Sequence, residues 1–216
     1  MRFRNRAQAG RKLAERLRAR YEAGALPDPV VLALPRGGVA VAQEVARALD
    51  APLDVVVVRK IGAPFQEEYG LGAIAGNDPP LLDEAALHDL GLTEDDLAAV
   101  VKRERAELRR RTRRYRGDRP APDLHGRTAV VVDDGLATGS TARAALRHVR
   151  SRGPARTVLA VPVGAPEAVE ALGEEADEVV CLHRPTSFTA VGLWYDDFEQ
   201  LTDDEVVGAL THHREA

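Results

Sequence analysis

Two adjacent carboxylates stand directly before a loop of small and hydroxyl-bearing residues near the middle of the chain. Residues 130–141 read VVVDDGLATGST, so an apolar run ends at Asp133 and Asp134. Vicinal sugar hydroxyls donate hydrogen bonds to carboxylates, and hard cations such as Mg²⁺ prefer oxygen ligands. The acidic half of this segment is therefore suited to a ribose diol with a Mg²⁺ ion nearby.

The other half of the segment is suited to an anion. A strand that passes through a glycine-bearing loop into a helix near Ser140 directs backbone N–H groups and the positive end of the helix dipole at one point. The hydroxyls of Thr138, Ser140 and Thr141 add donors. The loop is neither a Walker A motif, because serine follows Gly139, nor a GxGxxG motif. It predicts a phosphate cradle; a tight turn followed by a helix cap is the structural alternative.

A second glycine loop occurs earlier, within LPRGGVAVAQEVARAL at residues 34–49. The end of an apolar run is followed by Pro35, Arg36, Gly37 and Gly38 and then by a helical pattern. Free backbone amides around the glycines and the fixed charge of Arg36 would form a second anion site. Taken alone, the loop would be a plain strand-to-helix turn with an exposed arginine, but the first motif favours the anion site.

The aliphatic run, the two acids and the loop ending T-G-S-T resemble the phosphoribosyl-pyrophosphate (PRPP) signature of type I phosphoribosyltransferases. The resemblance implies that Asp133 and Asp134 hold the ribose hydroxyls and contact Mg²⁺, directly or through water and PRPP. It also implies that Arg36, Gly37 and Gly38 form a pyrophosphate loop, which often has an unusual peptide geometry in that family. The residues implied to bind the 5′-phosphate are Gly135, Ala137, Thr138, Gly139, Ser140 and Thr141.

Two basic residues follow the apolar run 55–58, where charge is costly unless a ligand or partner meets it. The family carries a mobile loop after its second strand that brings basic groups to the pyrophosphate. The resemblance therefore implies that Arg59 and Lys60 contact PRPP, with Glu67, Glu68 and Tyr69 in the moving part. Surface arginine and lysine that extend their charges into water are the alternative.

Aromatic residues make up only 4% of the chain, yet several gather between residues 188 and 198. Phe188, Trp194 and Tyr195 are candidates for stacking on a planar base. The segment VGLWYDD is similar to the V-G-x-x-x-D segment of the purine-salvage branch, which implies an acceptor contact by Asp196. A small C-terminal core is the alternative.

The elements that must position these loops follow a repeated pattern. Valine- and leucine-rich runs without alternation are typical of strands covered on both faces, and ligands of such sheets bind beyond the carboxyl ends of the strands. The predicted strands cover residues 29–34, 53–58, 128–132, 156–161 and 177–182, and the predicted helices cover 5–21, 39–49, 140–151 and 166–172. We expect an α/β fold with a doubly wound, mostly parallel sheet and a small hood.

Residues 1–216 are expected to form a single phosphoribosyltransferase-like domain. A mobile or inserted region covers about 60–120, with short strands at 71–75 and 80–83 and a helix from Thr93 to about Tyr115. The C-terminal hood candidate, which would cover the acceptor, is 183–216. Residues 102–119 contain ten Lys or Arg residues, which allow either a solvated helix or a nucleic-acid contact.

The expected activity is transfer of the 5-phosphoribosyl group from PRPP to a nitrogenous acceptor, a nucleobase, with release of pyrophosphate, as in nucleotide salvage. Asp133, Asp134, Arg36 and Lys60 are the expected catalytic residues. The alternatives are an amine acceptor, or a PRPP-sensing regulator that binds nucleic acid through residues 102–119.

The net charge of −4 and the absence of a long apolar run give no support to a nucleic-acid or membrane partner. We expect a cytoplasmic protein with small-molecule partners, PRPP and the acceptor, and homodimers are a reasonable default.

Overall fold

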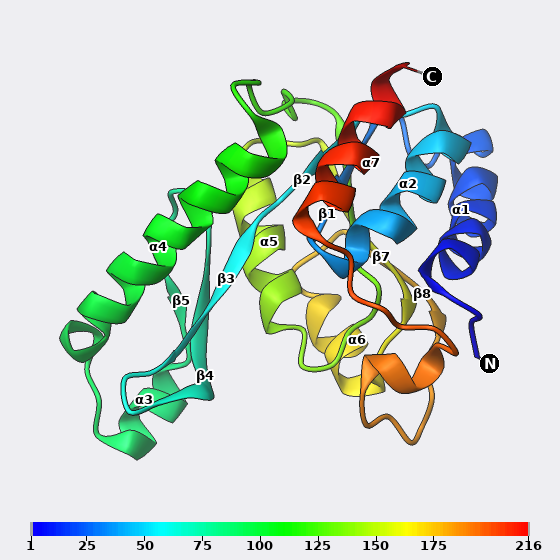
Figure 1. The fold of residues 1–216 in the computed structure, drawn as a ribbon. Coiled ribbons are helices and arrows are strands. Elements are labelled where there is room, and N and C mark those ends of the chain that lie inside the picture. Colours follow the sequence, from blue (N-terminus) through cyan, green and yellow to red (C-terminus); the bar gives the residue numbers. More distant parts are fainter. Residues whose placement is uncertain (1, 216) are drawn as a thin grey trace.

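Five parallel strands form the central sheet of the computed structural model, which describes residues 2–215 apart from the side chains of Glu68 and residues 212–215. Their order across the sheet is β2-β1-β6-β7-β8 (Figure 1). The bounds are β1 Pro29–Ala33, β2 Leu53–Val55, β6 Thr128–Val132, β7 Arg156–Val163 and β8 Glu178–His183. The predicted doubly wound parallel sheet is confirmed, and its strands begin where the valine-rich runs begin, within one residue.

Helices cover both faces of this sheet, as the unbroken apolar strands require. On one face, α1 (Arg6–Glu22), α2 (Gly37–Leu49) and α7 (Asp203–Glu215) enclose a core that includes Val31 and Val130. On the other, α5 (Ser140–Ser151) and α6 (Pro166–Leu172) pack over Val131 and its neighbours. Because successive strand residues point to opposite faces, β1, β6 and β7 each contribute to both cores.

A second, antiparallel sheet departs from the edge of the core and forms an arm with two helices (Figure 1). Its parts are β3 Val58–Ala63, β4 Gln66–Ala75, β5 Leu81–Leu82, α3 Glu84–Leu90 and α4 Glu94–Arg116. The prediction of one buried strand over 53–58 is wrong: β2 ends at Val55, and the chain turns into β3 before Arg59. Thr93 caps α4 with a reciprocal hydrogen-bonded box to Asp96, as its residue type predicts.

The C-terminal segment returns across the core beside the N-terminus. A short 3₁₀ helix, η1 (Val191–Trp194), leads into Tyr195, which forms an isolated parallel bridge with Phe3. A small apolar cluster forms there, in which Phe3 and Tyr195 pack with Val163. Among the described residues, no helix combines the length and the apolar character needed to cross a membrane.

Candidate functional site

The two glycine loops meet at the carboxyl ends of β1 and β6. The backbone N–H of Leu34 donates to the carbonyl of Val132 over 2.9 Å. A Cβ on Gly38 would lie 2.6 Å from the Val132 carbonyl oxygen, and one on Gly37 would lie 2.0 Å from Asp134 Oδ2. The loops are thus in direct contact, and only glycine fits at both positions. The peptide bond between Pro35 and Arg36 is cis, an unusual geometry of the kind implied for the pyrophosphate loop.

Each of the two acids is oriented through one of its oxygens. Asp133 Oδ1 accepts from the backbone N–H of Asp134 over 2.8 Å, and Asp134 Oδ2 accepts from Arg6 Nε over 2.7 Å. The two carboxyl groups also interact with each other through a side-chain hydrogen bond. Two adjacent carboxyl groups are therefore fixed side by side just after β6, where one ligand could contact both.

The electrostatics of this pair favour a ligand that donates hydrogen bonds or carries positive charge. Burial, and then the neighbouring charge of Asp134, raise the pKa of Asp133 well above its ordinary value. Burial also raises the pKa of Asp134, and the Arg6 guanidinium opposes that rise. Negative charge at this position is costly in the ligand-free protein, so sugar hydroxyls or a cation would relieve it.

Residues of the N- and C-terminal segments fix the position of Asp134. Arg6 Nη1 donates to the carbonyl of Glu199 over 2.6 Å, and its guanidinium lies 3.8 Å from the centre of the Phe198 ring. The Tyr195 hydroxyl donates to the backbone carbonyl of Asp134 over 2.6 Å. Sequence reasoning missed Arg6, because nothing distinguishes it from the other arginines of a basic N-terminal stretch.

Replacing Arg6 with methionine should destabilise the protein strongly. The Arg6 and Asp134 side chains are only 9% and 14% exposed, so the change would leave a buried carboxylate without its cation. Breaking a buried pair costs roughly 3–5 kcal/mol. The matched control is Arg18→Met on the same helix, because Arg18 pairs with Glu22 in an exposed position and such pairs contribute about 0–1 kcal/mol. Urea denaturation of both variants measures the difference, and equal losses would contradict the role of Arg6.

The loop before α5 is open to an anion. Gly139 adopts a φ of +77° ahead of the helix, and among the described residues no side chain caps the first turn. The first N–H groups of an α-helix have no partner within it, so an anion can accept from them. The hydroxyls of Thr138 and Ser140 lie 3.3 Å apart, next to Ala137 and Thr141. The structure thus places the predicted cradle residues together.

The basic residues predicted to contact pyrophosphate lie in different places. Arg36 stays on its loop, with Nη1 4.0 Å from Asp203 Oδ1 at the start of α7. Arg59 donates from Nε to Oε2 of the buried Glu104 on α4 over 2.9 Å. Lys60 is exposed on β3. The structure does not bring Arg59 to the two glycine loops; its partner is an acid on the arm itself. Of the predicted moving part, the Glu68 side chain lies outside the described residues.

The aromatic candidates divide into buried and accessible side chains. Tyr195 is only 2% exposed and packs between Phe3 and Phe198, so the prediction that it stacks on a base is wrong. Its ring completes a small core, and its hydroxyl is bonded to Asp134. Trp194 is partly exposed.

Trp194 packs edge-on against His183, with ring centres 4.9 Å apart. Phe188 is also partly exposed, and Asp196 forms an exposed ion pair of 2.9 Å with Arg2. A Cβ on Gly135 would lie 2.6 Å from Val191, which places the η1 segment directly against the acidic loop.

Comparison with known proteins supports this geometry. A family model described as "Phosphoribosyl transferase domain" matches residues 2–196. A Mycobacterium tuberculosis H37Rv protein, provisionally named a phosphoribosyl transferase, is 48% identical over 99% of this chain and 47% of its own length. The chain thus spans about half the length of the curated relatives it matches. The crystal structure of TT1426 from Thermus thermophilus superposes with a TM-score of 0.82 at 48% identity, covering 98% of this chain and 99% of that one.

A shorter match, 41% identity over 58 residues, links the chain to the uracil phosphoribosyltransferase of Lactobacillus gasseri and covers 27% of this chain and 28% of that protein. The family match covers both glycine loops, the paired acids and the η1 segment. This chain therefore belongs to the phosphoribosyl transferase domain family.

Proposed function

We propose that the protein transfers the 5-phosphoribosyl group of PRPP to a ring nitrogen of a nucleobase and releases pyrophosphate. The observation that carries this proposal is the pair of adjacent acids, Asp133 and Asp134, each held by a hydrogen bond and lying directly before an uncapped helix. A ribose diol on the carboxyl oxygens and a 5′-phosphate on the loop 137–141 would use both halves of this arrangement.

The residues would act mainly by electrostatics. As the nitrogen attacks C1 of the ribose, the bond from C1 to the pyrophosphate oxygen breaks and positive charge develops on the sugar ring. The carboxylates stabilise that charge, while Arg36 and the amides of Gly37 and Gly38 stabilise the leaving pyrophosphate. The base loses its ring N–H proton to solvent. Lys60 would join the pyrophosphate only after movement of the arm, which would also exclude water.

The donor set fits Mg²⁺ bound together with the substrate. Among the described residues there is no cluster of three or more acidic, histidine or cysteine side chains that could hold a metal alone. Mg²⁺ usually binds through one or two carboxylates together with substrate oxygens. Asp133 and Asp134 would hold it, directly or through water, and it would supply positive charge next to the pyrophosphate.

The acceptor would lie between the acidic loop and the hood candidate. Trp194 and Phe188 are partly exposed there, so they remain candidates for contact with a base. To bind the acceptor, Asp196 would have to give up its exposed ion pair with Arg2. The free-energy cost of this exchange is small because surface ion pairs are weak.

A panel of acceptors tests this function. It contains purine and pyrimidine bases, and ammonium as the amine acceptor. Each acceptor is incubated with the protein, PRPP and Mg²⁺, and pyrophosphate release is measured. Release is expected with a subset of the bases and not in the Asp133→Asn/Asp134→Asn double variant. Release with ammonium but with none of the bases would overturn the proposal that the acceptor is a nucleobase. If PRPP binds saturably but no acceptor in the panel causes pyrophosphate release, the transferase function would be overturned and a PRPP sensor favoured.

A further inference from the structure

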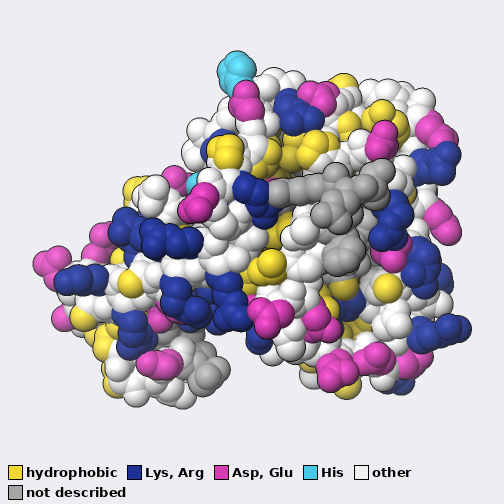
Figure 2. Space-filling view, turned by 45° about the horizontal axis from the view of Figure 1, so that its top comes forward, with side chains coloured by type: hydrophobic (Ala, Val, Ile, Leu, Met, Phe, Trp, Pro, Cys, Tyr) yellow, Lys and Arg dark blue, Asp and Glu magenta, His cyan; other side chains and the backbone are white. Residues whose placement is uncertain are grey.

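The basic side chains of α4 fall into two groups. Arg110 and Arg111 both bind Glu107, and Arg114 lies 3.0 Å from Asp203. In contrast, Arg109 and Arg113 have no carboxylate within 4.0 Å in the part of the chain that the structure describes. These two residues are four positions apart and so share one face of the helix. Figure 2 shows the Lys and Arg side chains gathered over the arm on the left of the molecule.

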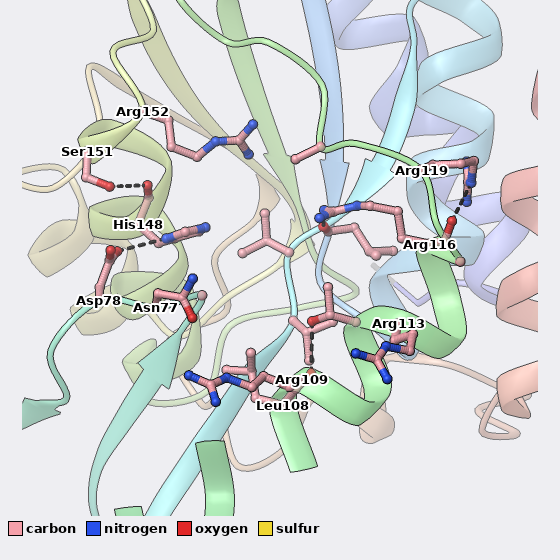
Figure 3. Close-up of a pocket in the computed structure, with 17 residues that line it drawn as sticks. Asn77, Asp78, Leu108, Arg109, Arg113, Arg116, Arg119, His148, Ser151 and Arg152 are labelled. Carbon is pink, nitrogen blue, oxygen red and sulfur yellow. Dashed lines mark hydrogen bonds and ion pairs between the residues drawn. The ribbon is translucent and has the colours of Figure 1, made fainter. Parts of the chain in front are cut away.

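That face of α4 lines a cavity of about 600 Å³ on the flank of the core. The opposite wall is the C-terminal half of α5, and the link between β2 and β3 contributes to its lining. Figure 3 shows Arg113 and Arg116 extending from α4, with Arg152 and His148 extending from the α5 side. The charged and polar lining residues are Asn77, Asp78, Arg109, Thr112, Arg113, Arg116, Arg119, His148, Ser151 and Arg152.

The cavity holds five arginines and a single lining carboxylate, Asp78, which is hydrogen-bonded to His148 Nδ1 over 2.8 Å. Arg116 is paired with Asp54 behind the lining. Burial, and then the charge of Arg116, lower the pKa of Arg152. Arg119 Nη1 is buried without a hydrogen-bond partner among the described residues. Like charges gathered in this way are unfavourable unless an anion binds between them.

The rest of the lining is suited to an organic group. Val55, Val56, Val57 and Leu108 are apolar, and Asn77, Thr112 and Ser151 can exchange hydrogen bonds with a ligand. Small-molecule sites commonly have about 300–1,000 Å³ and a few well-placed polar groups. We infer that this cavity binds a phosphorylated small molecule of nucleotide size, with its phosphates between the arginines and its organic part against residues 55–57.

This site is separate from the candidate PRPP site. None of the residues that line the cavity belongs to 36–38 or 133–141. His148 is eight residues along α5 from Ser140, about 12 Å at the helical rise of 1.5 Å per residue. The donor phosphate would bind before the first turn of the same helix, so one ligand of this size would not fill both.

The shape of the basic surface favours a small ligand over nucleic acid. A nucleic-acid site usually presents a basic stripe to solvent. Here several exposed arginines of α4 are paired with acids, and Arg109 and Arg113, which have no acidic partner among the described residues, line a concave cavity. The basic stretch 102–119 is therefore better explained by a pocket than by a phosphate-backbone contact.

Titration of the full chain with ATP, GTP, CTP and UTP at low salt, followed by calorimetry, tests this inference. The pocket variant is Arg109→Ala/Arg113→Ala. Its matched control is Lys102→Ala/Arg110→Ala, which removes two charges from the same helix outside the cavity. We expect the parent and the control to bind at least one nucleotide, and the pocket variant to bind it at least about tenfold more weakly, since hydrogen bonds to charged groups are strong.

Inorganic tripolyphosphate and a single-stranded RNA oligonucleotide serve as further probes. Weaker binding of tripolyphosphate than of the nucleotide would support a contact with the organic part. Equal affinity of the pocket and control variants would overturn the inference, because the nucleotide would then bind elsewhere, for example at the donor loop. The inference would also be overturned if none of the four nucleotides bound. It would likewise be overturned if the RNA bound more tightly than the nucleotides and its binding were weakened by the loss of Arg109 and Arg113.

Discussion

Replacement of Asp133 by asparagine is expected to lower PRPP turnover by about 10²–10³-fold, the usual loss when one preorganised electrostatic contact to a transition state is removed. Asparagine keeps the shape and can still accept from the Asp134 N–H, so the loop geometry should persist. What is lost is the negative charge that would face the ribose ring and Mg²⁺. Steady-state pyrophosphate release measures the effect, and turnover within about threefold of the parent would contradict it.

The same change should stabilise the fold at neutral pH. The pKa of Asp133 is raised in the folded state. At pH values between the ordinary carboxyl pKa of 3.8 and this raised pKa, the folded protein therefore binds more protons than the unfolded chain. The free energy of unfolding of the parent protein therefore falls as pH rises through that range. Asparagine does not titrate, so the variant does not show this fall. The melting temperature at pH 7 should rise, by about 2–4 °C for each kcal/mol, with no difference between the proteins below that range.

A drop in the melting temperature of Asp133→Asn at pH 7 would show that the carboxylate stabilises the fold. That outcome would contradict the raised pKa of Asp133 and the cost of its buried negative charge. A variant that loses turnover and gains stability is expected when the replaced group serves function at the expense of stability.

The second large effect is expected from Gly37→Ala. Its Cβ would lie 2.0 Å from Asp134 Oδ2 and 3.2 Å from Arg6 Nε, so it would force the two partners apart. Overpacking of this kind costs about 1–3 kcal/mol. We expect a lower melting temperature together with a loss of turnover comparable to that of the Asp133 variant, because Asp134 would no longer be held in position.

Gly70→Ala is the matched control for this substitution. Gly70 lies on β4, where an added Cβ would meet nothing within 4 Å. It should therefore change stability and turnover little. If Gly37→Ala were as stable and active as Gly70→Ala, the close contact between the pyrophosphate loop and Asp134 would be wrong.

Most of the core could be predicted from the sequence because its signals are local. A run such as 128–132, apolar at nearly every position, indicates a strand buried on both faces, and the glycine and hydroxyl residues after it indicate a phosphate loop. The structure places that strand and the helix after it within the predicted residues, Thr128–Val132 and Ser140–Ser151. Each of these features depends on neighbours close by in the sequence.

The arm and the support of the acids depend on contacts between distant residues. Arg59 is paired with Glu104, 45 positions away, and Arg6 with Asp134, 128 positions away. One sequence does not tell which acid an arginine will meet. Nor does it distinguish Tyr195, whose ring is enclosed by Phe3 and Phe198, from an aromatic side chain that faces a ligand.

The central claim is that the acidic pair and the loop 137–141 bind PRPP, and calorimetric titration with PRPP and Mg²⁺ tests it most directly. The parent protein is predicted to bind one PRPP per chain, and the Asp133→Asn/Asp134→Asn double variant to bind it at least about a hundredfold more weakly, since two charged contacts are lost. Equal affinity in the two proteins, or no saturable binding by the parent at millimolar PRPP, would contradict the claim.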